Sequence, residues 1–542
     1  MDPDVDEDLE FQAACREIID ELLASKLKSK DQLNAIKIRH CKAHGLPSLP
    51  KDAQVLHHAT AEERELLAPV LRLRRNRTIS GISVVAVMTK PVPCPGSCVY
   101  CPGEKSQPDR PVAKSYTGRE PAALRSLMYD YDPYDQVASR IDDLEAIGHS
   151  CDKIELIVMG GTFLSAPKDY QDCFVQGCID GVLGKRTSSL DEAKSLAETS
   201  ARRITAITFE TRPDYCDAPH VDAMLDYGGT RVEIGVQTTF DDIYTLVNRG
   251  HDTAASKHAI QVAKDAGFKV CVHVMPNLPG SSVDRDREMF ATLFDDEGYR
   301  PDYLKIYPCL VVDGTVLKDW WDAGTYKPYP TEDLIDMLAD VKARLPSYTR
   351  IQRVQRDIPA NLILDGVRNG NLREMVWAKM QEKGLHCNCI RCREYGFSQD
   401  RFEEAPIPSI EDLVIQTDFY PASGGMEAFI SALHPDTGQI FGYVRARRPS
   451  DLAHRSEVMA SNSAVIRELR VVGEVVPINK IAKKLQAQHR GLGKKLMNVA
   501  EELAVHEFGA EKMLVIAGLG VRPYFYGLGY EPDGPYVSKL LG

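Results

Sequence analysis

The segment "KPVPCPGSCVYCPGE", residues 90–104, places Cys94, Cys98 and Cys101 in one loop rich in proline and glycine. Gaps of three and two residues allow the three thiolates to reach one small inorganic cluster. Iron–sulfur clusters ordinarily take four protein ligands, so a [4Fe–4S] cluster held by three keeps one iron open. The alternatives are a zinc knuckle and three reduced structural thiols. A zinc site needs a fourth ligand, and the nearest candidates, His149 and Cys151, lie beyond a predicted helix. The segment therefore favours the cluster.

The region from Gly81 to about Pro359 predicts an α/β fold with a parallel sheet. Short apolar runs rich in β-branched residues alternate with helical patterns, two of which lie at 118–147 and 252–266. The six runs are residues 82–88, 154–160, 204–210, 231–237, 269–275 and 303–309. This alternation predicts a partial or full β/α barrel, whose chemistry sits where strands end. The cysteine loop follows the first run. A three-cysteine loop at that end is the arrangement of radical S-adenosylmethionine (SAM) enzymes, in which the sulfonium compound chelates the open iron.

Polar or flexible residues also follow the later strands of this predicted barrel. Four successive strand ends point such groups toward one rim, which predicts a cofactor site there. Glycines at these positions allow a backbone to approach a ligand closely. The residues at three of these ends are Gly160, Gly161, Thr162, Glu210, Arg212 and Gln237, and the fourth end is the fixed turn "MPNLPG" at 275–280.

A second cysteine group, Cys387, Cys389 and Cys392, occupies "HCNCIRC". Three thiols within six residues need one more ligand to complete a tetrahedral zinc site. Cys309, at the end of the sixth run, is the predicted fourth ligand. A second iron–sulfur cluster is the rival interpretation, and dense Cys-x-Cys spacing favours zinc over it. His386 is a less favourable ligand because it directly precedes Cys387.

The C-terminal region is similar to GNAT acetyltransferases. A hairpin with its turn at 435–438 precedes a strand at 464–473, and then comes the loop Gln488-x-x-Gly491-x-Gly493 before an amphipathic helix. Backbone N–H groups and the dipole at a helix start form a binding site for a pyrophosphate. The strand, loop, helix, next strand and aromatic "RPYFYGLGY" occur in GNAT order, which predicts an acyl-CoA site.

Length and composition indicate a multidomain globular protein. The 542 residues exceed one ordinary core, and we expect domains at 1–78, 79–395 and 396–542. No apolar run approaches a membrane span, and the N-terminus is acidic, so we expect a cytoplasmic protein. Fourteen cysteines, several in two tight clusters, favour metal ligation over disulfides.

The N-terminal region is basic although the net charge is −12. A predicted amphipathic helix at 8–24 is followed by clustered lysine and arginine residues. The local charge of this segment is more informative about its partners than the net charge of the chain. These residues either contact nucleic acid or form a solvated helix face. They are Lys26, Lys28, Lys30, Lys37, Arg39, Arg72, Arg74 and Arg75.

From about residue 20 onward the sequence resembles the catalytic subunit of Elongator, the tRNA wobble-uridine modifying enzyme. The segments that carry the resemblance are "VAVMTKP", "CVYCPG", "SYTGREP", "IVMGGTF", "FETRPDYC", "VEIGVQT" and "RELRVVG". The short cysteine loop suggests a bacterial or archaeal type. The resemblance implies a [4Fe–4S] cluster on Cys94, Cys98 and Cys101. It also implies SAM as cofactor, acetyl-CoA as co-substrate, and conversion of U34 in tRNA to 5-carboxymethyluridine. It makes the basic N-terminal residues plausible phosphate contacts.

The resemblance also assigns acetyl-CoA contacts residue by residue. Lys153 matches a family lysine that contacts acetyl-CoA, and Tyr524 matches the first of two adjacent family tyrosines. Phe525 stands where the second tyrosine would be, so a mechanism that needs that hydroxyl is in doubt here. The remaining positions are Glu468, Leu469, Arg470, Val471, Leu492, Gly493 and Lys494.

Two other functions compete with this interpretation. A GNAT protein lysine acetyltransferase with an inert barrel would need no SAM, and a tRNA-binding scaffold would bind tRNA without turnover. Partner subunits of the Elongator type or a homodimer are both compatible with the sequence.

Overall fold

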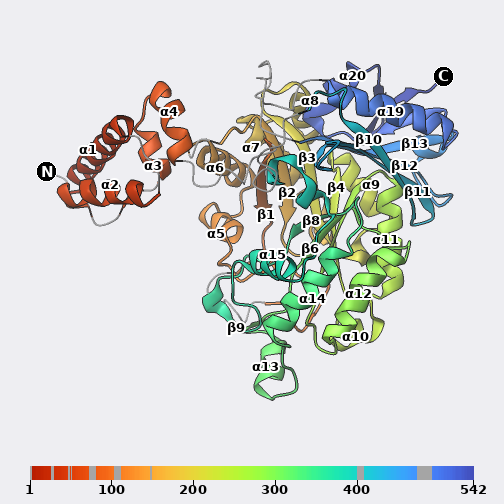
Figure 1. The fold of residues 1–542 in the computed structure, drawn as a ribbon, viewed down its shortest axis with the longest axis horizontal. Coiled ribbons are helices and arrows are strands. Elements are labelled where there is room, and N and C mark those ends of the chain that lie inside the picture. The colour runs from red at the N-terminus through yellow and green to blue at the C-terminus, as the bar shows by residue number, and fades with distance from the viewer. Residues whose placement is uncertain are drawn as a thin grey trace.

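A computed structural model describes residues 3–25, 30–46, 49–50, 52–71, 81–102, 111–146, 149–398, 408–472 and 491–542. Within these ranges lie a group of N-terminal helices, two seven-stranded sheets and one two-stranded sheet (Figure 1). None of the described helices combines the length and apolarity needed to cross a bilayer. Some predicted functional positions fall outside the described residues: Lys26, Lys28, Arg72, Arg74, Arg75 and Gln488. The side chain of Lys30 also falls outside them.

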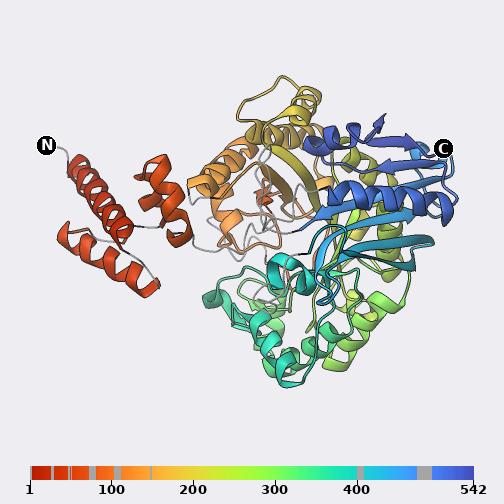
Figure 2. The ribbon, with the colours of Figure 1, turned by 45° about the horizontal axis from the view of Figure 1, so that its top comes forward.

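Four helices form the N-terminal part, which lies to one side of both large sheets (Figure 2). They are α1 (Pro3–Ala24), α2 (Lys30–Ala43), α3 (Asp52–His57) and α4 (Ala61–Leu71). Apolar residues at helical spacing along α1, such as Ile18 and Leu22, are buried in a small separate core. The helix predicted at 8–24 is therefore confirmed and begins earlier, at Pro3.

The first large sheet is parallel throughout and contains all six predicted strands. Its order is β1-β2-β3-β4-β5-β6-β8, so β1 and β8 are its edges and the barrel is partial. The strands are β1 (Ser83–Met88), β2 (Lys153–Met159), β3 (Arg203–Thr211), β4 (Arg231–Gln237), β5 (Lys269–Val274), β6 (Tyr303–Ile306) and β8 (Arg350–Arg353). The strand β8 was not predicted, because its four residues "RIQR" contain no apolar run.

Helices cover the outer face of this sheet (Figure 1). The helix predicted at 118–147 is two helices, α5 and α6, because Asp130 and Tyr131 adopt positive φ between them. The helices of this region are α5 (Pro121–Met128), α6 (Pro133–Ala146), α7 (Lys168–Leu183), α8 (Leu190–Thr199), α9 (Ala218–Asp226), α10 (Asp241–Leu246), α11 (Thr253–Asp265), α12 (Val283–Asp295), α13 (Val316–Asp322), α14 (Thr331–Ala343), α15 (Leu372–Glu382), α16 (Ile390–Arg393) and α17 (Tyr395–Ser398). A small sheet pairs β7 (Val311–Val312) with β9 (Ile363–Asp365).

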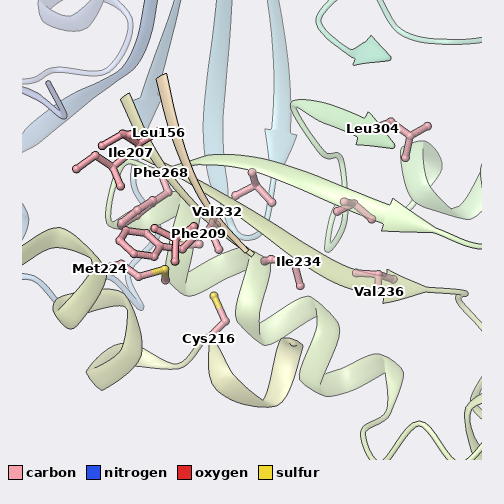
Figure 3. Close-up of a cluster of buried hydrophobic side chains, with 14 of the residues drawn as sticks. Leu156, Ile207, Phe209, Cys216, Met224, Val232, Ile234, Val236, Phe268 and Leu304 are labelled. Atoms are coloured by element: carbon pink, nitrogen blue, oxygen red, sulfur yellow. The ribbon is translucent and has the colours of Figure 1, made fainter. Parts of the chain in front are cut away.

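Alternation along the strands separates an apolar outer layer from a polar interior. On β4, Val232, Ile234 and Val236 are fully buried and pack with residues such as Phe209 and Met224 (Figure 3). Successive side chains of a strand point to opposite faces, so the residues between these valines and isoleucine face the interior of the barrel. Glu233 is one of these interior residues, and Arg231, two residues before it, faces the same side and is also charged.

The second large sheet belongs to the C-terminal region. Its strands are β10 (Val414–Ala422), β11 (Gly425–Leu433), β12 (Ile440–Arg448), β13 (Ser463–Val471), β14 (Lys512–Val515), β16 (Tyr536–Leu540) and β15 (Glu531–Asp533), in that order across the sheet. Only β13 and β14 pair in parallel, and only through residues 463–466, so the end of β13 leaves β14. The helices here are α18 (Ser456–Met459), α19 (Leu492–His506) and α20 (Arg522–Tyr526).

A buried ion network joins the two large sheets. Arg467 on β13 binds the Asp302 carboxylate through two nitrogens at 2.7 and 2.6 Å, and it binds Glu427 on β11 at 2.8 Å. All three side chains are fully buried. Removing one partner would leave an uncompensated buried charge, which typically costs about 3–5 kcal/mol. The network therefore fixes the second sheet against the first.

Candidate functional site

The cysteine loop lies at the carboxyl end of the parallel sheet, directly after β1. Neighbouring backbone holds it: the Val99 N–H donates to the Val247 carbonyl at 3.1 Å, and the Leu317 N–H donates to the Val99 carbonyl at 2.9 Å. Cys98 is buried, while Cys94 and Cys101 are half-buried. The loop therefore has a fixed backbone with its thiols at the edge where barrel enzymes carry their sites.

Arg249 approaches the loop from the segment after β4. Its Nη1 donates to the Cys98 Sγ at 3.5 Å, and its Nη2 donates to the Gly235 carbonyl at 2.5 Å. A hydrogen bond from Cys101 and the Arg249 charge outweigh burial and lower the pKa of Cys98 to about 4. The thiolate is the form that binds metal. The sequence analysis missed Arg249, which lies in a loop without an apolar pattern.

Arg212 supports the same loop from the end of β3. Its Nε and Nη2 bind the Asp214 carboxylate at 2.9 Å, whereas its buried Nη1 has no hydrogen-bond partner among the described residues. A Cβ added at Gly96 would lie 1.9 Å from that Nη1, so a larger residue there would displace the Arg212 guanidinium. Unpartnered donors beside cysteine ligands fit an iron–sulfur cluster, whose sulfurs accept hydrogen bonds.

The predicted strand-end residues converge on two places. Near the cysteines, the Thr162 Oγ1 lies 3.9 Å from the Cys94 Sγ. Gly160 and Gly161 just before it have φ of +125° and +70°, where glycine is favoured. Glu210 instead points into the barrel, where its Oε2 accepts from the Tyr116 hydroxyl at 2.9 Å.

Gln237 ends β4 with φ of +72°. A Cβ at Gly235 would lie 2.8 Å from both the Gln237 Nε2 and the Arg249 Nη2. The Gln237 amide therefore lies beside the guanidinium that contacts Cys98.

The second cysteine group is compact. The sulfurs of Cys387, Cys389 and Cys392 lie within 4.8 Å of one another; Cys387 and Cys389 precede α16, and Cys392 lies within it. A tetrahedral zinc with Zn–S bonds of about 2.3 Å holds its sulfurs about 3.8 Å apart, so the group fits a single ion. Hydrogen bonds from Cys387 and Cys392 outweigh burial and lower the pKa of Cys389 well below its usual range.

Cys309 does not join this group, contrary to the sequence prediction. It is fully buried in a different apolar cluster with Val99, Leu317 and Tyr326. Burial raises the pKa of the Cys309 thiol to about 12 although Tyr326 hydrogen-bonds it. Cys309 lies three residues beyond the end of β6, and its cluster also contains Cys98 of the first cysteine loop, so the fourth ligand of the compact group is not Cys309 in this structure.

The predicted acyl-CoA residues partly converge at the start of α19. Gly491 adopts φ of +94°, and a Cβ at Gly493 would lie 2.8 Å from the Tyr524 hydroxyl and 3.8 Å from the Val471 Cγ2. Tyr524 is 44% exposed and lies beside this helix start. Lys494 is exposed on the first turn.

Other predicted acyl-CoA residues point elsewhere. Phe525 and Leu492 are buried in the core of the second sheet, and Leu469 packs against that core. The Glu468 carboxylate faces the first sheet, where it accepts from the Tyr443 hydroxyl and the Arg445 Nε, each at 3.0 Å, and from the Tyr303 hydroxyl. The Glu468 and Phe525 side chains are thus buried in protein, and their predicted contact with acetyl-CoA stays a prediction. Arg470 is enclosed by charged and phenolic neighbours near the same interface.

Lys153 begins β2, at the opposite end of the barrel from the cysteine loop. Six residues of strand, about 20 Å, separate it from Met159. Burial lowers the pKa of Lys153, although Asp152 opposes this. The turn before α20 packs nearby, because a Cβ at Gly520 would lie 2.6 Å from the backbone nitrogen of Ile204, which pairs with Ile154. Lys153 is thus on the side of the C-terminal region.

The side chains of two basic N-terminal residues, Lys37 and Arg39, are among those that the structure describes. Lys37 is buried, and its ammonium binds the Asp52 carboxylate and the Pro50 carbonyl. It is a structural residue and not the phosphate contact that the sequence suggested. Arg39 is exposed and pairs with Glu21 at 2.9 Å.

Comparison with known proteins identifies the family. Residues 92–293 match the Radical SAM superfamily, residues 301–382 the Radical_SAM C-terminal domain, and residues 11–79 the ELP3 N-terminal domain. A "tRNA uridine(34) acetyltransferase" from Methanocaldococcus jannaschii is 43% identical, over 97% of this chain and 96% of the relative. The chain belongs to the Elongator complex protein 3 (Elp3) family. "Elongator complex protein 3" from Schizosaccharomyces pombe is 41% identical over 97% of this chain and 98% of its own length.

A solved Elp3 supports the same assignment. The archaeal Methanocaldococcus infernus Elp3 with an N-terminal deletion matches with a TM-score of 0.75 and 40% identity, covering 86% of this chain and 100% of that chain. The radical SAM match implies a [4Fe–4S] cluster and SAM for this Elp3-family chain. The thiols and arginines at the carboxyl end of its partial barrel fit such a group.

Proposed function

We propose that this chain forms 5-carboxymethyluridine at the wobble position U34 of tRNA from acetyl-CoA by radical SAM chemistry. A relative named "tRNA uridine(34) acetyltransferase" aligns over 97% of the chain, which supports the substrate. The structural observation that carries the proposal is the cysteine loop at the catalytic end of the barrel, with Arg249 donating to the Cys98 Sγ.

In this proposal Cys94, Cys98 and Cys101 hold the [4Fe–4S] cluster. When bound, the cluster supplies the electron for reductive cleavage of SAM. Arg249 and Arg212 orient the loop and donate hydrogen bonds. Gly160 and its neighbours bind SAM where their backbone permits close approach. The other residues of the proposed SAM site are Gly161, Thr162, Glu210 and Gln237.

Acetyl-CoA binds the C-terminal region, which we propose is a GNAT domain spanning 396–542. Backbone N–H groups from Gly491 to Lys494 bind the pyrophosphate, with Gln488 as a further contact. Tyr524 lies over this helix start, and Lys153 is the proposed contact from the barrel side. Glu468, Leu469, Arg470 and Val471 then contribute through their backbone, while Leu492 and Phe525 support the cleft from the core.

The remaining assignments concern tRNA and zinc. The basic region within residues 1–78 binds the anticodon stem-loop through phosphate contacts, for which Arg39 is exposed. The barrel domain spans 79–395 and ends with a structural zinc site on Cys387, Cys389 and Cys392, completed by a ligand other than Cys309.

An anaerobic assay tests the function. Reconstituted full-length protein receives tRNA, SAM, acetyl-CoA and a reductant, and mass spectrometry measures 5′-deoxyadenosine and modified nucleosides. We expect both 5′-deoxyadenosine and 5-carboxymethyluridine from wild type, neither from Cys98→Ser, and both from the matched control Cys173→Ser, which changes an exposed thiol on α7.

Other outcomes identify the competing functions. Acetylated protein formed without SAM, with Cys98→Ser still active, would identify a protein lysine acetyltransferase. Tight tRNA binding without 5′-deoxyadenosine would identify a scaffold. Either result would overturn the proposal.

A further inference from the structure

The barrel interior carries charge where β/α barrels normally pack branched aliphatic side chains. Glu233 on β4, His273 on β5 and Lys305 on β6 come from three adjacent strands and meet there. Their strand neighbours Val232, Val272 and Leu304 face the covering helices and form the apolar layer. The three polar residues therefore occupy inward positions that packing alone would fill with valine or leucine.

His273 and Glu233 form a buried imidazole–carboxylate pair. The His273 Nε2 lies 2.8 Å from the Glu233 Oε2, and Glu233 is fully buried. Burial opposes the charged form of Glu233, but Lys305, His273 and Arg231 outweigh it and hold the pKa of Glu233 well below its usual range. An ionised carboxylate only accepts hydrogen bonds, so in the neutral imidazole Nε2 carries the proton and Nδ1 has the lone pair.

The Nδ1 lone pair is available to a small molecule. No group among the described residues hydrogen-bonds the His273 Nδ1, and the side chain remains 12% exposed. The ring is steadied by Tyr307, whose ring centroid lies 5.3 Å away in an edge-to-face arrangement. A histidine oriented by a buried carboxylate, with its other nitrogen open, is the arrangement of a general base.

The pair lies toward the end of the barrel that carries the cysteine loop. Glu233 and Gly235 are two residues apart and so face the same side of β4. The Gly235 carbonyl accepts from Arg249, which also donates to the Cys98 Sγ. His273 lies one residue before Val274, which pairs with Gln237 at the same rim. The proposed base is thus on the side of the barrel where the reaction takes place.

We infer that His273 is the general base that hydrolyses the CoA thioester attached to U34, with Glu233 as its positioning residue. The inference rests on the proposed function, in which the acetyl methyl carbon joins C5 of uridine and leaves a thioester to be cleaved. Water loses a proton to the His273 Nδ1 while its oxygen bonds to the thioester carbonyl carbon. The C–S bond then breaks, and the proton passes from His273 to the departing CoA sulfur. No electron acceptor or donor is required.

Lys305 completes the arrangement. Burial opposes its ammonium form, but Glu233 outweighs burial and raises the pKa of Lys305, which stays charged. Its Nζ also lies 3.7 Å from the Glu210 Oε1. A fixed cation beside the base favours the negative charge that develops on a carbonyl oxygen during hydrolysis.

The test separates hydrolysis from the preceding radical step. Full-length reconstituted His273→Gln, whose amide still donates to Glu233, is compared with wild type and with His506→Gln, an exposed histidine at the end of α19. The reaction is quenched with hydroxylamine, which converts a remaining thioester to a hydroxamate but leaves a carboxylate unchanged. Mass spectrometry then gives both uridine products together with 5′-deoxyadenosine.

We expect His273→Gln to keep 5′-deoxyadenosine within about twofold of wild type while 5-carboxymethyluridine falls by about 10²-fold or more and the hydroxamate rises. Glu233→Gln should shift the product ratio in the same direction by about tenfold, which keeps the test usable if His273→Gln does not fold. An unchanged ratio in either folded variant would overturn the inference, as would a parallel loss of 5′-deoxyadenosine and product. Absence of 5′-deoxyadenosine from wild type would instead overturn the proposed function itself.

Discussion

The two cysteine groups of this chain both offer sulfur ligands, but they differ in how closely the sulfurs lie together. Cys387, Cys389 and Cys392 bring their sulfurs within 4.8 Å of one another, and Cys389 is fully buried. Cys94, Cys98 and Cys101 do not form so tight a group, and guanidinium groups approach them from two other loops. A tight group suits one ion, whereas a cluster spreads its ligands because each thiolate binds a different iron. The difference predicts a closed structural site and an open reactive one.

Cys98→Ser should give the largest functional effect. Losing one of three cluster ligands is expected to abolish 5′-deoxyadenosine formation, because no fourth thiolate is available in that loop. The melting temperature of the protein as purified should change by no more than a few degrees, since the loop backbone is held by Val247 and Leu317. Anaerobic iron content and thermal unfolding measure the two effects. A Cys98→Ser variant that keeps its iron but unfolds would show that Cys98 has a structural role instead.

Cys389→Ser should instead act on stability. We expect loss of one bound metal ion and a melting temperature lower by roughly 5–10 °C, because structural metal binding contributes directly to folding. Elemental analysis and calorimetry check this, with Cys173→Ser as the control. Iron in place of zinc at this group would show that both sites hold clusters.

Arg249→Gln should change the site of Cys94, Cys98 and Cys101 and leave the site of Cys387, Cys389 and Cys392 unchanged. Removing a charge-assisted hydrogen bond to the Cys98 Sγ withdraws about 1.5–3 kcal/mol from the reduced cluster, which carries more negative charge. The reduction potential should fall by roughly 65–130 mV, because 59 mV corresponds to about 1.4 kcal/mol for one electron. Spectroelectrochemistry measures it, and Arg285→Gln, an arginine paired with Asp242 near the surface, is the matched control. An unchanged potential would mean that Arg249 only holds the backbone of Gly235.

The smallest effect concerns pH. Burial and the neighbouring Arg249 lower the pKa of His251 to about 4. As pH falls, the His251 side chain therefore takes up a proton in the unfolded state before it does so in the folded state. The contribution of His251 to the free energy of unfolding is fully present above about pH 6.5. It is lost as pH falls toward 4, by at most about 1.4 kcal/mol per pH unit. His251→Asn should flatten this slope in denaturant titrations between pH 4 and 6.5. A slope unchanged in the variant would exclude His251 as its source.

Local patterns predicted much of this molecule. Runs such as 231–237 and 269–275 became β4 and β5 because continuous apolar strands must be covered on the outer face. The loop of Cys94 fell at the carboxyl end of β1 for the same topological reason. The strand β8 was missed because its polar residues are held by pairing with β6, which no local pattern records.

Residue contacts across the fold were much harder to predict. Cys309 was expected beside Cys387 because both are thiols near the end of the barrel, yet side-chain direction buries it with Tyr326. Glu468 was expected in the acyl-CoA cleft but pairs with Arg445 at the interface of the two sheets. Strand alternation does show Glu233 and His273 as inward polar residues, and reading it strand by strand would have found them.

Residue type and spacing along the chain are enough to predict the cysteine loop, the alternating α/β order and the family. Which polar groups meet depends on the three-dimensional fold: Arg249 with Cys98, and Glu233 with His273 and Lys305. A buried charge is stable only beside a partner, and these partners lie 40 to 151 residues apart in the sequence until the parallel sheet and its loops bring them together.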